Sequence, residues 1–223
     1  KPTKSLNERT AIQLITDMVD EMGKKLKIIS LGPLTNIASA IKSKPEIVEQ
    51  ISELTIMGGA FNLTHYGHGN VSAVAEYNIW HDPEAAKIVF NSGMPIKMVG
   101  WDVSRTYAVF NPEDTAALRA INTPLAHFCV DILKAVEQFA LTTTQLQGFD
   151  LPDPIAMAIA LDPTVATRTD RCFVAIETVS PLCRGQSVAD HLHLMGREPN
   201  AEVVMEASRE RFLRILFDAV SRT

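Results

Sequence analysis

Polar side chains that can hold several hydroxyl groups follow an apolar segment in the first third of the chain. The stretch LTIMGGAFNLTHYGHGNVSAVAEYN ends at Asn78 and also contains Asn70 and Glu76. An amide side chain both donates and accepts hydrogen bonds, and a carboxylate accepts strongly. Glu76 and Asn78 are two residues apart, so in an extended segment both would point to the same side. The pattern predicts a site that grips a sugar, and a polar loop whose side chains only cap turns is the simpler alternative.

A further acidic residue, Asp153, lies far along the chain in LPDPIAMAIALDP. Asp-Pro occurs at Asp82, Asp153 and Asp162, and this pair is typical of a helix start, with aspartate as N-cap and proline as the first helical residue. For all three, the N-cap is the favoured interpretation from residue type alone. Asp153 differs because the loop 148–152 precedes it and could face a pocket.

Five other residues could take part in chemistry, and each also has an ordinary structural explanation. His65 and His68 could act as general acids near neutral pH, or could be exposed histidines of a polar loop. Thr35, in LGPLTNIA, is most simply a residue of a first helical turn, although its carbonyl could serve a hard cation. Trp80 and Trp101 are expected in the core rather than as platforms for base stacking.

The segments that must position these side chains alternate between strand and helix. Ser5-Leu6-Asn7-Glu8 has the form of a capping box for a first helix that runs to Gly23. Strands are predicted over 26–31, 54–57, 95–99, 172–179 and 202–205. Helices are predicted over 34–41, after Pro45, and over 82–93, 112–121, 124–139, 153–160 and 209–220. This order predicts an α/β fold, an open and mostly parallel sheet with helices on both faces.

Ligands in such sheets bind at the carboxyl edge of the strands. The loops 32–35, 58–78 and 100–107 follow predicted strands and are therefore expected to surround a pocket. The fold alone does not say which ligand enters that pocket.

Composition restricts the class of protein. The chain has 223 residues, and one large domain is favoured because no linker separates two cores. A net charge of −5 argues against a nucleic-acid partner. The longest apolar run, Ile155–Leu161, is too short to cross a membrane. Three widely spaced cysteines with no metal-binding pattern indicate reduced thiols and a cytoplasmic protein.

Several motifs together resemble one known family. LGPLTNIA, IMGGAF, the GN pair, AEYNIWHDPEAAKIVF, DPIAMAIALDP and the ending GREPNAEVVMEASRERFLRIL are similar to the nucleoside hydrolases, the inosine-uridine preferring N-ribohydrolases. The resemblance covers essentially the whole chain. It implies an enzyme that hydrolyses the N-glycosidic bond of purine or pyrimidine ribonucleosides, as in nucleoside salvage, and releases ribose and free base. It also implies a small-molecule nucleoside as partner, and a homo-oligomer, either a dimer or a tetramer.

The resemblance also implies roles for individual residues. A tightly held calcium ion binds the ribose diol and the attacking water in this family. Its ligands would include the carbonyl of Thr35 and the carboxylate of Asp153, and Asp153 would be catalytic. The ribose contacts would come from four residues that match the family motifs: Met57, Asn70, Glu76 and Asn78.

Two departures from the family pattern limit this interpretation. The family begins with an aspartate cluster of the form DxDxxxDD, which supplies most calcium ligands, and no such cluster occurs in the chain. Pro152 stands where many members have a histidine that protonates the departing base, which leaves His65 and His68 as candidate acids. Residues 1–223 are therefore expected to be the carboxyl-terminal part of a single nucleoside hydrolase-like domain, incomplete for catalysis on their own.

Two other functions stay open at this point. One is a non-catalytic ribose- or nucleoside-binding protein, or a truncated relative that kept the sugar site. The other is an interaction module whose exposed sheet edge pairs with another chain. Base contacts are expected from residues 142–151 and from the loop that contains His65 and His68.

Overall fold

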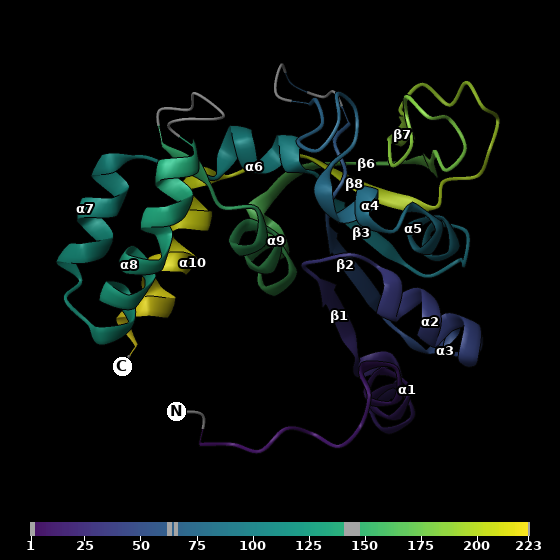
Figure 1. Cartoon of the computed structure of the whole chain (residues 1–223), viewed down its shortest axis with the longest axis horizontal. Coiled ribbons are helices and arrows are strands. Elements are labelled where there is room, and N and C mark those ends of the chain that lie inside the picture. The colour runs from purple at the N-terminus through teal and green to yellow at the C-terminus, as the bar shows by residue number, and fades with distance from the viewer. Residues whose placement is uncertain (1–2, 62–63, 65–66, 141–147, 223) are drawn as a thin grey trace.

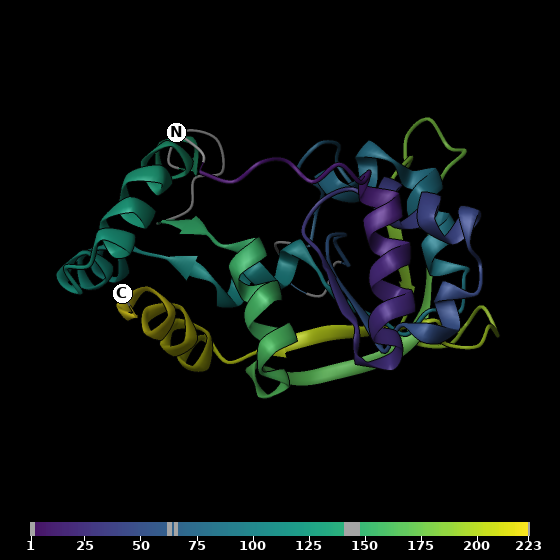
Figure 2. The same ribbon diagram turned by 90° about the horizontal axis from the view of Figure 1, so that it is seen from below.

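A six-stranded sheet forms the centre of the computed structural model, which describes residues 3–61, 64, 67–140 and 148–222. The strand order is β1-β2-β3-β8-β6-β7. The first four strands of this order are parallel, and β6 and β7 are antiparallel to their neighbours. The strands are β1 (Lys27–Ser30), β2 (Glu53–Met57), β3 (Ile96–Val99), β6 (Ala166–Ile176), β7 (Ser187–Asp190) and β8 (Ala201–Ala207). Figure 2 shows the long strands β6 and β8 side by side.

Helices cover both faces of the sheet, because the strands are apolar on both sides. Leu54 and Ile56 of β2 point into a core shared with α1, α2, α3 and α5, whereas Met57 points into a second core with α6 to α10. Figure 1 shows α7, α8 and α10 grouped at one end of the molecule. The helices are α1 (Ala11–Met22), α2 (Thr35–Ser43), α3 (Ile47–Gln50), α4 (Tyr77–His81), α5 (Pro83–Phe90), α6 (Trp101–Tyr107), α7 (Pro112–Ala120), α8 (Pro124–Phe139), α9 (Pro152–Leu161) and α10 (Arg209–Ser221).

The predicted α/β fold with a mostly parallel sheet is confirmed. The predicted helix over 124–139 matches α8 at both ends, because Thr123 caps it and proline opens it. Several elements of the described ranges were not predicted, among them α4, α6 and the edge strand β7. The loop expected over 100–107 is wrong, because α6 begins directly after Gly100. A small second sheet pairs β4 (Val109–Phe110) with β5 (Phe149–Asp150).

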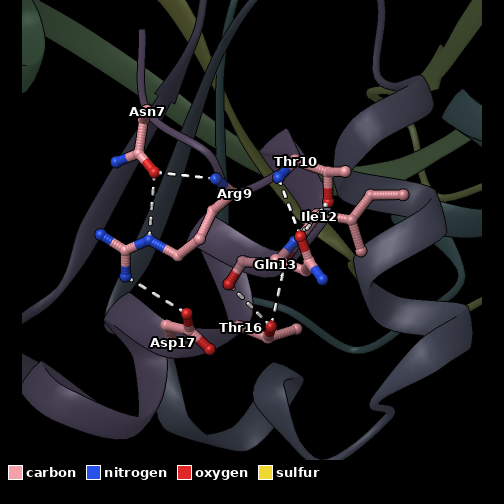
Figure 3. A network of polar contacts seen from close by, with 7 residues as sticks. All are labelled: Asn7, Arg9, Thr10, Ile12, Gln13, Thr16 and Asp17. Atoms are coloured by element: carbon pink, nitrogen blue, oxygen red, sulfur yellow. Dashed lines mark hydrogen bonds and ion pairs between the residues drawn. The ribbon is translucent and has the colours of Figure 1, made fainter. Parts of the chain in front are cut away.

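The first helix begins later than the sequence suggests. The capping box lies at Thr10 and Gln13, not at 5–8: the Gln13 N–H donates to Thr10 Oγ1 at 3.2 Å, and the Thr10 N–H donates to Gln13 Oε1 at 2.9 Å. Figure 3 shows this pair together with the neighbouring contacts of Arg9 with Asn7 and Asp17. Thr10 and Gln13 have the same residue types and spacing as a capping box, so the motif was correct and its position was not.

Two further expectations concern the described residues only. Among the helices of the described ranges, none has the length and hydrophobicity that a membrane crossing requires. The cysteines Cys129, Cys172 and Cys183 are free thiols, and Cys172 is fully buried.

Candidate active site

Glu76 is a buried carboxylate that joins the end of β2 to the start of α4. One of its oxygens, Oε1, accepts from the Asn78 N–H at 2.9 Å; the other, Oε2, accepts from the N–H groups of Gly59 at 2.9 Å and Ile79 at 3.2 Å. The residue is only 2% exposed, and it serves as the N-cap of α4. Burial raises the pKa of Glu76, and the three backbone donors oppose that rise. The carboxylate therefore fixes the connection that carries the candidate sugar-binding residues.

Gly59 is required in this connection because of its backbone angle and its close neighbours. Its φ is +75°, in the region that favours glycine. A Cβ atom there would lie 2.6 Å from Met98 Cε and 2.7 Å from Ser187 Oγ. The backbone N–H of Gly59 can therefore reach Glu76 only because the residue has no side chain.

Asn78 lies in the first turn of α4, so the extended segment predicted for Glu76 and Asn78 is wrong. The Glu76 carboxylate still reaches Asn78, because as N-cap it accepts from the backbone N–H of Asn78. Asn78 Nδ2 donates to the carbonyl of Met57 at 3.1 Å and lies 3.3 Å from its sulfur. Asn78 and Met57 thus form one unit with Glu76 at the carboxyl edge of the sheet.

Asn70 belongs to the same group through the backbone of α4. Its Oδ1 accepts from the Tyr77 N–H at 2.8 Å, and its own N–H donates to the Ala75 carbonyl at 3.1 Å. Unlike Glu76, Asn70 is exposed. Asn70 also lines the cavity beside the site.

A cavity of about 550 Å³ opens beside these residues. Trp101 is buried at 7% exposure, as expected for a core residue, but it also lines this cavity. The Arg105 guanidinium lies 4.6 Å from the centroid of the Trp101 ring, and His68 meets that ring edge-on at 5.7 Å. Trp80, predicted in the core, is 40% exposed. The cavity is lined by His68, Gly69, Asn70, Tyr77, Trp101, Arg105, Val136, Ala140, Phe149, Asp150 and Pro152.

Asp153 is not the N-cap that its sequence context suggests. Leu151 is the N-cap of α9 and makes no side-chain cap, and Asp153 is an exposed residue of the first turn. Its carboxylate is therefore free of the capping role, which Asp82 and Asp162 do fill for their own helices. Asp153 also contributes to the raised pKa of Glu76, so the two carboxyl groups are close enough to interact.

Asp153 lies where a negative charge is favourable, in the first turn of a helix. Partial burial of its carboxyl group nevertheless raises its pKa. Pro152, the residue before it, lines the cavity. Asp153 thus follows a residue of the cavity wall and interacts electrostatically with Glu76.

Thr35 begins α2, as predicted, and its side chain contacts another helix start. Its hydroxyl donates to Asp82 Oδ2 at 2.6 Å, while Asp82 Oδ1 accepts from the Ala85 N–H at 3.0 Å. Helical geometry pairs the carbonyl of a first-turn residue with an N–H four residues on, and a carbonyl oxygen has a second lone pair. The Thr35 carbonyl can therefore still accept a cation.

Sequence reasoning did not single out Asp150, Ser104 and Arg105. Ser104 Oγ donates to Asp150 Oδ2 at 2.7 Å, and burial raises the pKa of Asp150. The signal was present, since WDVSR directly follows an apolar strand, but its residues were assigned to a loop. His68 is exposed and its Nδ1 contacts the Gly69 carbonyl at 2.8 Å. The other candidate acid, His65, lies outside the described residues.

Fold and site together define an α/β protein with a cavity beside the carboxyl edge of its sheet. The chain matches the family described as "Inosine-uridine preferring nucleoside hydrolase" over residues 1–214, and it belongs to that family. Its relatives are named ribonucleoside hydrolases, so the family is one of N-glycosyl hydrolases that act on ribonucleosides.

Two kinds of relatives support this assignment. Pyrimidine-specific ribonucleoside hydrolase RihA from Shigella flexneri serotype 5b is 36% identical over 219 residues, which are 98% of this chain and 68% of that protein. The solved structure of a purine-preferring ribonucleoside hydrolase from Gardnerella vaginalis is 33% identical with a TM-score of 0.87, covering 98% of this chain and 67% of that one. The plant nucleoside hydrolase PpNRh1, at 24% identity and a TM-score of 0.89, covers all of this chain and 71% of its own, and it shares the fold.

Proposed function

We propose that this chain carries the ribose-binding part of a calcium-dependent nucleoside hydrolase, which cleaves a ribonucleoside into ribose and free base. One observation carries the proposal: the hydrogen-bonded group of Glu76, Asn78, Met57 and Asn70 lies beside an aromatic cavity. A nucleoside has the same two parts, a sugar with several hydroxyls and a flat base.

The sugar would bind to the polar atoms that the scaffold leaves available. Asn78 uses its amide nitrogen on Met57, so its Oδ1 can accept from a ribose hydroxyl. Glu76 Oε1 accepts one backbone bond and has a further lone pair. The Asn70 amide nitrogen can donate from the opposite side. Because hydrogen bonds within the protein already hold these groups in place, little ordering would accompany binding.

The base would occupy the cavity against Trp101. Flat π-systems prefer offset or edge contacts with aromatic rings, and Trp101, Tyr77 and His68 all line this space. The two relatives described above are named for opposite base preferences, pyrimidine and purine. We therefore assign base preference to the cavity residues of this chain and not to its family.

Calcium fits the oxygen donors that this chain offers, but only in part. Calcium takes six to eight oxygens, and the described residues offer the Asp153 carboxylate and the Thr35 carbonyl. When bound, the ion would orient the ribose hydroxyls and lower the pKa of a water molecule. We propose that the remaining ligands come from carboxylates outside these 223 residues, so that the chain alone does not turn over substrate. Asp153 would then hold both the ion and the reacting end of the sugar.

Protonation of the departing base needs a group other than Pro152. A general acid contributes about 10²–10⁴-fold to a rate. His68 lines the cavity and bonds to the Gly69 carbonyl through Nδ1, which leaves Nε2 for the base. We propose His68 for this role, with His65 as the second candidate.

The test is the hydrolysis rate of the complete protein with the substitutions Asp153→Asn and Glu76→Gln. Asp162→Asn is a matched control, because Asp162 also precedes a proline but caps a different turn. We expect each site variant to lose more than about tenfold in turnover, roughly 1.4 kcal/mol, and the control to keep its rate. If both site variants stay within tenfold of the parent, the assignment of the site is wrong.

A non-catalytic nucleoside-binding protein is the second candidate, favoured by the partial set of calcium donors and by Pro152. Calorimetry with a nucleoside, with and without calcium, distinguishes the two functions in the complete protein. Binding without release of free base supports the binding protein, and calcium-dependent release of base supports the enzyme.

We also propose a homo-oligomer, a dimer or a tetramer, working in the cytoplasm in nucleoside salvage. Large apolar side chains are strongly exposed on the segments around β7, among them Leu182 at 85% and Leu194 at 82%. Exposed apolar patches of this kind mark contacts with other proteins. Light scattering that gives the mass of a monomer at micromolar concentration would contradict the oligomer.

A further inference from the structure

Three side chains of different chemistry meet where β6 lies beside the end of β7. Asp170, Cys172 and His191 each place one possible ligand atom within 4.8 Å of the others. Asp170 and Cys172 are two residues apart on β6, so they share a face of the strand. Asp190 pairs with Phe173 in the antiparallel register, which puts the next residue, His191, beside Cys172.

The surroundings of this cluster are negatively charged and incompletely bonded. His191 Nδ1 lies 3.0 Å from Asp170 Oδ2, and its Nε2 is buried without a hydrogen-bond partner among the described residues. Cys172 is fully buried. The carboxylates of Asp170 and Asp190 place negative charge near this buried thiol. The same negative field would attract a cation.

We propose that Asp170, Cys172 and His191 bind one divalent transition-metal ion of the zinc class. Thiolate, imidazole and carboxylate are the usual zinc ligands, whereas calcium takes oxygens. Tetrahedral ligands with bonds of about 2.0–2.3 Å lie roughly 3.3–3.8 Å apart, so small side-chain rotations suffice here. Binding replaces the thiol proton of Cys172, which leaves to solvent, and water fills the fourth position.

The ion would act on structure rather than on the reaction of the family. Cys172 pairs with Ala201, the first residue of β8, whereas the candidate active site follows the last residues of β2 and β3. None of the three ligands is among the described residues that line the cavity beside Trp101. Figure 1 shows β7 at one side of the sheet, and β7 is last in the strand order. The ion would tie this edge to β6.

An ion can reach the cluster from solvent. The side chains of His191 and Asp170 are 24% and 32% exposed, while the thiol lies beneath them. Zinc would therefore enter past the two outer ligands and reach sulfur last.

The experiment is a titration of the 223-residue chain, stripped of metal by a chelator, with cobalt(II) as the spectroscopic probe and then with zinc. We expect one cobalt ion per chain, a near-ultraviolet thiolate-to-cobalt absorption band, and loss of that band when zinc is added. Excess calcium should leave the band unchanged. Zinc should also raise the melting temperature, because a ligand that binds only the folded state stabilises it.

Matched variants identify the ligands. Cys172→Ala and His191→Gln should each weaken binding by more than about 10- to 100-fold, the loss that is typical when only an outer-shell partner of a ligand is removed. Cys183→Ser and His193→Gln change the same residue types outside the cluster and should bind as the parent does. If Cys172→Ala fails to fold, the His191→Gln variant still tests the site, because the His191 side chain is partly exposed. A parent chain with no cobalt band, or a band that survives His191→Gln but disappears in Cys183→Ser, would overturn the proposal.

Discussion

Removal of the Glu76 carboxylate is the strongest test of how the site is built. Glu76→Ala leaves three backbone N–H groups without their acceptor, those of Gly59, Asn78 and Ile79. Hydrogen bonds to a charged group contribute about 1.5–3 kcal/mol each, so the gross loss is several kcal/mol. The pKa of Glu76 is raised, which indicates that burial destabilises the ionised carboxylate more than the three hydrogen bonds stabilise it. The net destabilisation is therefore smaller, about 3 kcal/mol.

Glu76→Gln separates the bonds from the charge. Glutamine keeps one oxygen, which can still accept from Gly59 and Ile79, but its amide NH₂ would face the Asn78 N–H, donor against donor. We expect a loss of about 1–2 kcal/mol for glutamine, less than for alanine. Urea unfolding followed by circular dichroism measures both values. Glu76 does not hold the connection after β2 if Glu76→Ala lowers the free energy of unfolding by less than about 0.5 kcal/mol, or if Glu76→Gln lowers it as much as Glu76→Ala does.

Three further predictions concern the same edge of the sheet. Gly59→Ala should cost about 2–4 kcal/mol in urea unfolding, because φ is positive and a Cβ would lie within 2.7 Å of two atoms. Gly93→Ala is the control: its φ of +85° is similar but the space around it is open, so it should cost only about 1–2 kcal/mol. Because burial raises the pKa of Asp150, the folded state binds more protons than the unfolded state just above pH 3.8. The contribution of Asp150 to the free energy of unfolding is therefore fully present below that pH and is lost as the pH rises through the folded pKa. Asp150→Asn should remove this loss when the free energy of unfolding is measured at several pH values. In the complete protein, His68→Gln should lower turnover by about 10²-fold or more with ordinary nucleosides but not with a riboside whose leaving group needs no proton; equal losses on both substrates would exclude His68 as the acid.

Local signals in the sequence were enough for most of the helices and for the central strands. Thr123 before Pro124 and the apolar spacing of α8 lie within one segment, so both ends of that helix could be predicted. Helix α4 has five residues, too few to show a period, and its N-cap is a glutamate, which is not among the preferred capping residues. This glutamate is held in place partly by the Gly59 N–H, which is 17 residues away.

The same contrast, between local sequence signals and contacts with distant residues, applies to the candidate site. Residue type was enough to name Asn70, Glu76 and Asn78 as candidates, since amide and carboxylate side chains can hold several hydroxyls. Residue type could not show that Asp153 leaves the capping position to Leu151, because Asp-Pro predicts the cap equally well at Asp82, where it is correct. Tertiary packing decides which aspartate does not cap its helix, and the residues next to it in the sequence do not indicate this.

The position of Glu76 has a consequence for binding. A carboxylate that already accepts three backbone hydrogen bonds cannot swing toward a ligand without giving them up. The ordering of Asn78 and of the connection after β2 is therefore complete in the folded protein, before any sugar arrives. A flexible site would have to order these groups on binding, at about 0.5–1.5 kcal/mol for each side chain. Hydrogen exchange of the Gly59 and Ile79 amides should thus be slow in the free protein and nearly unchanged by ligand. A marked slowing on binding would show that their hydrogen bonds to Glu76 form only with the sugar.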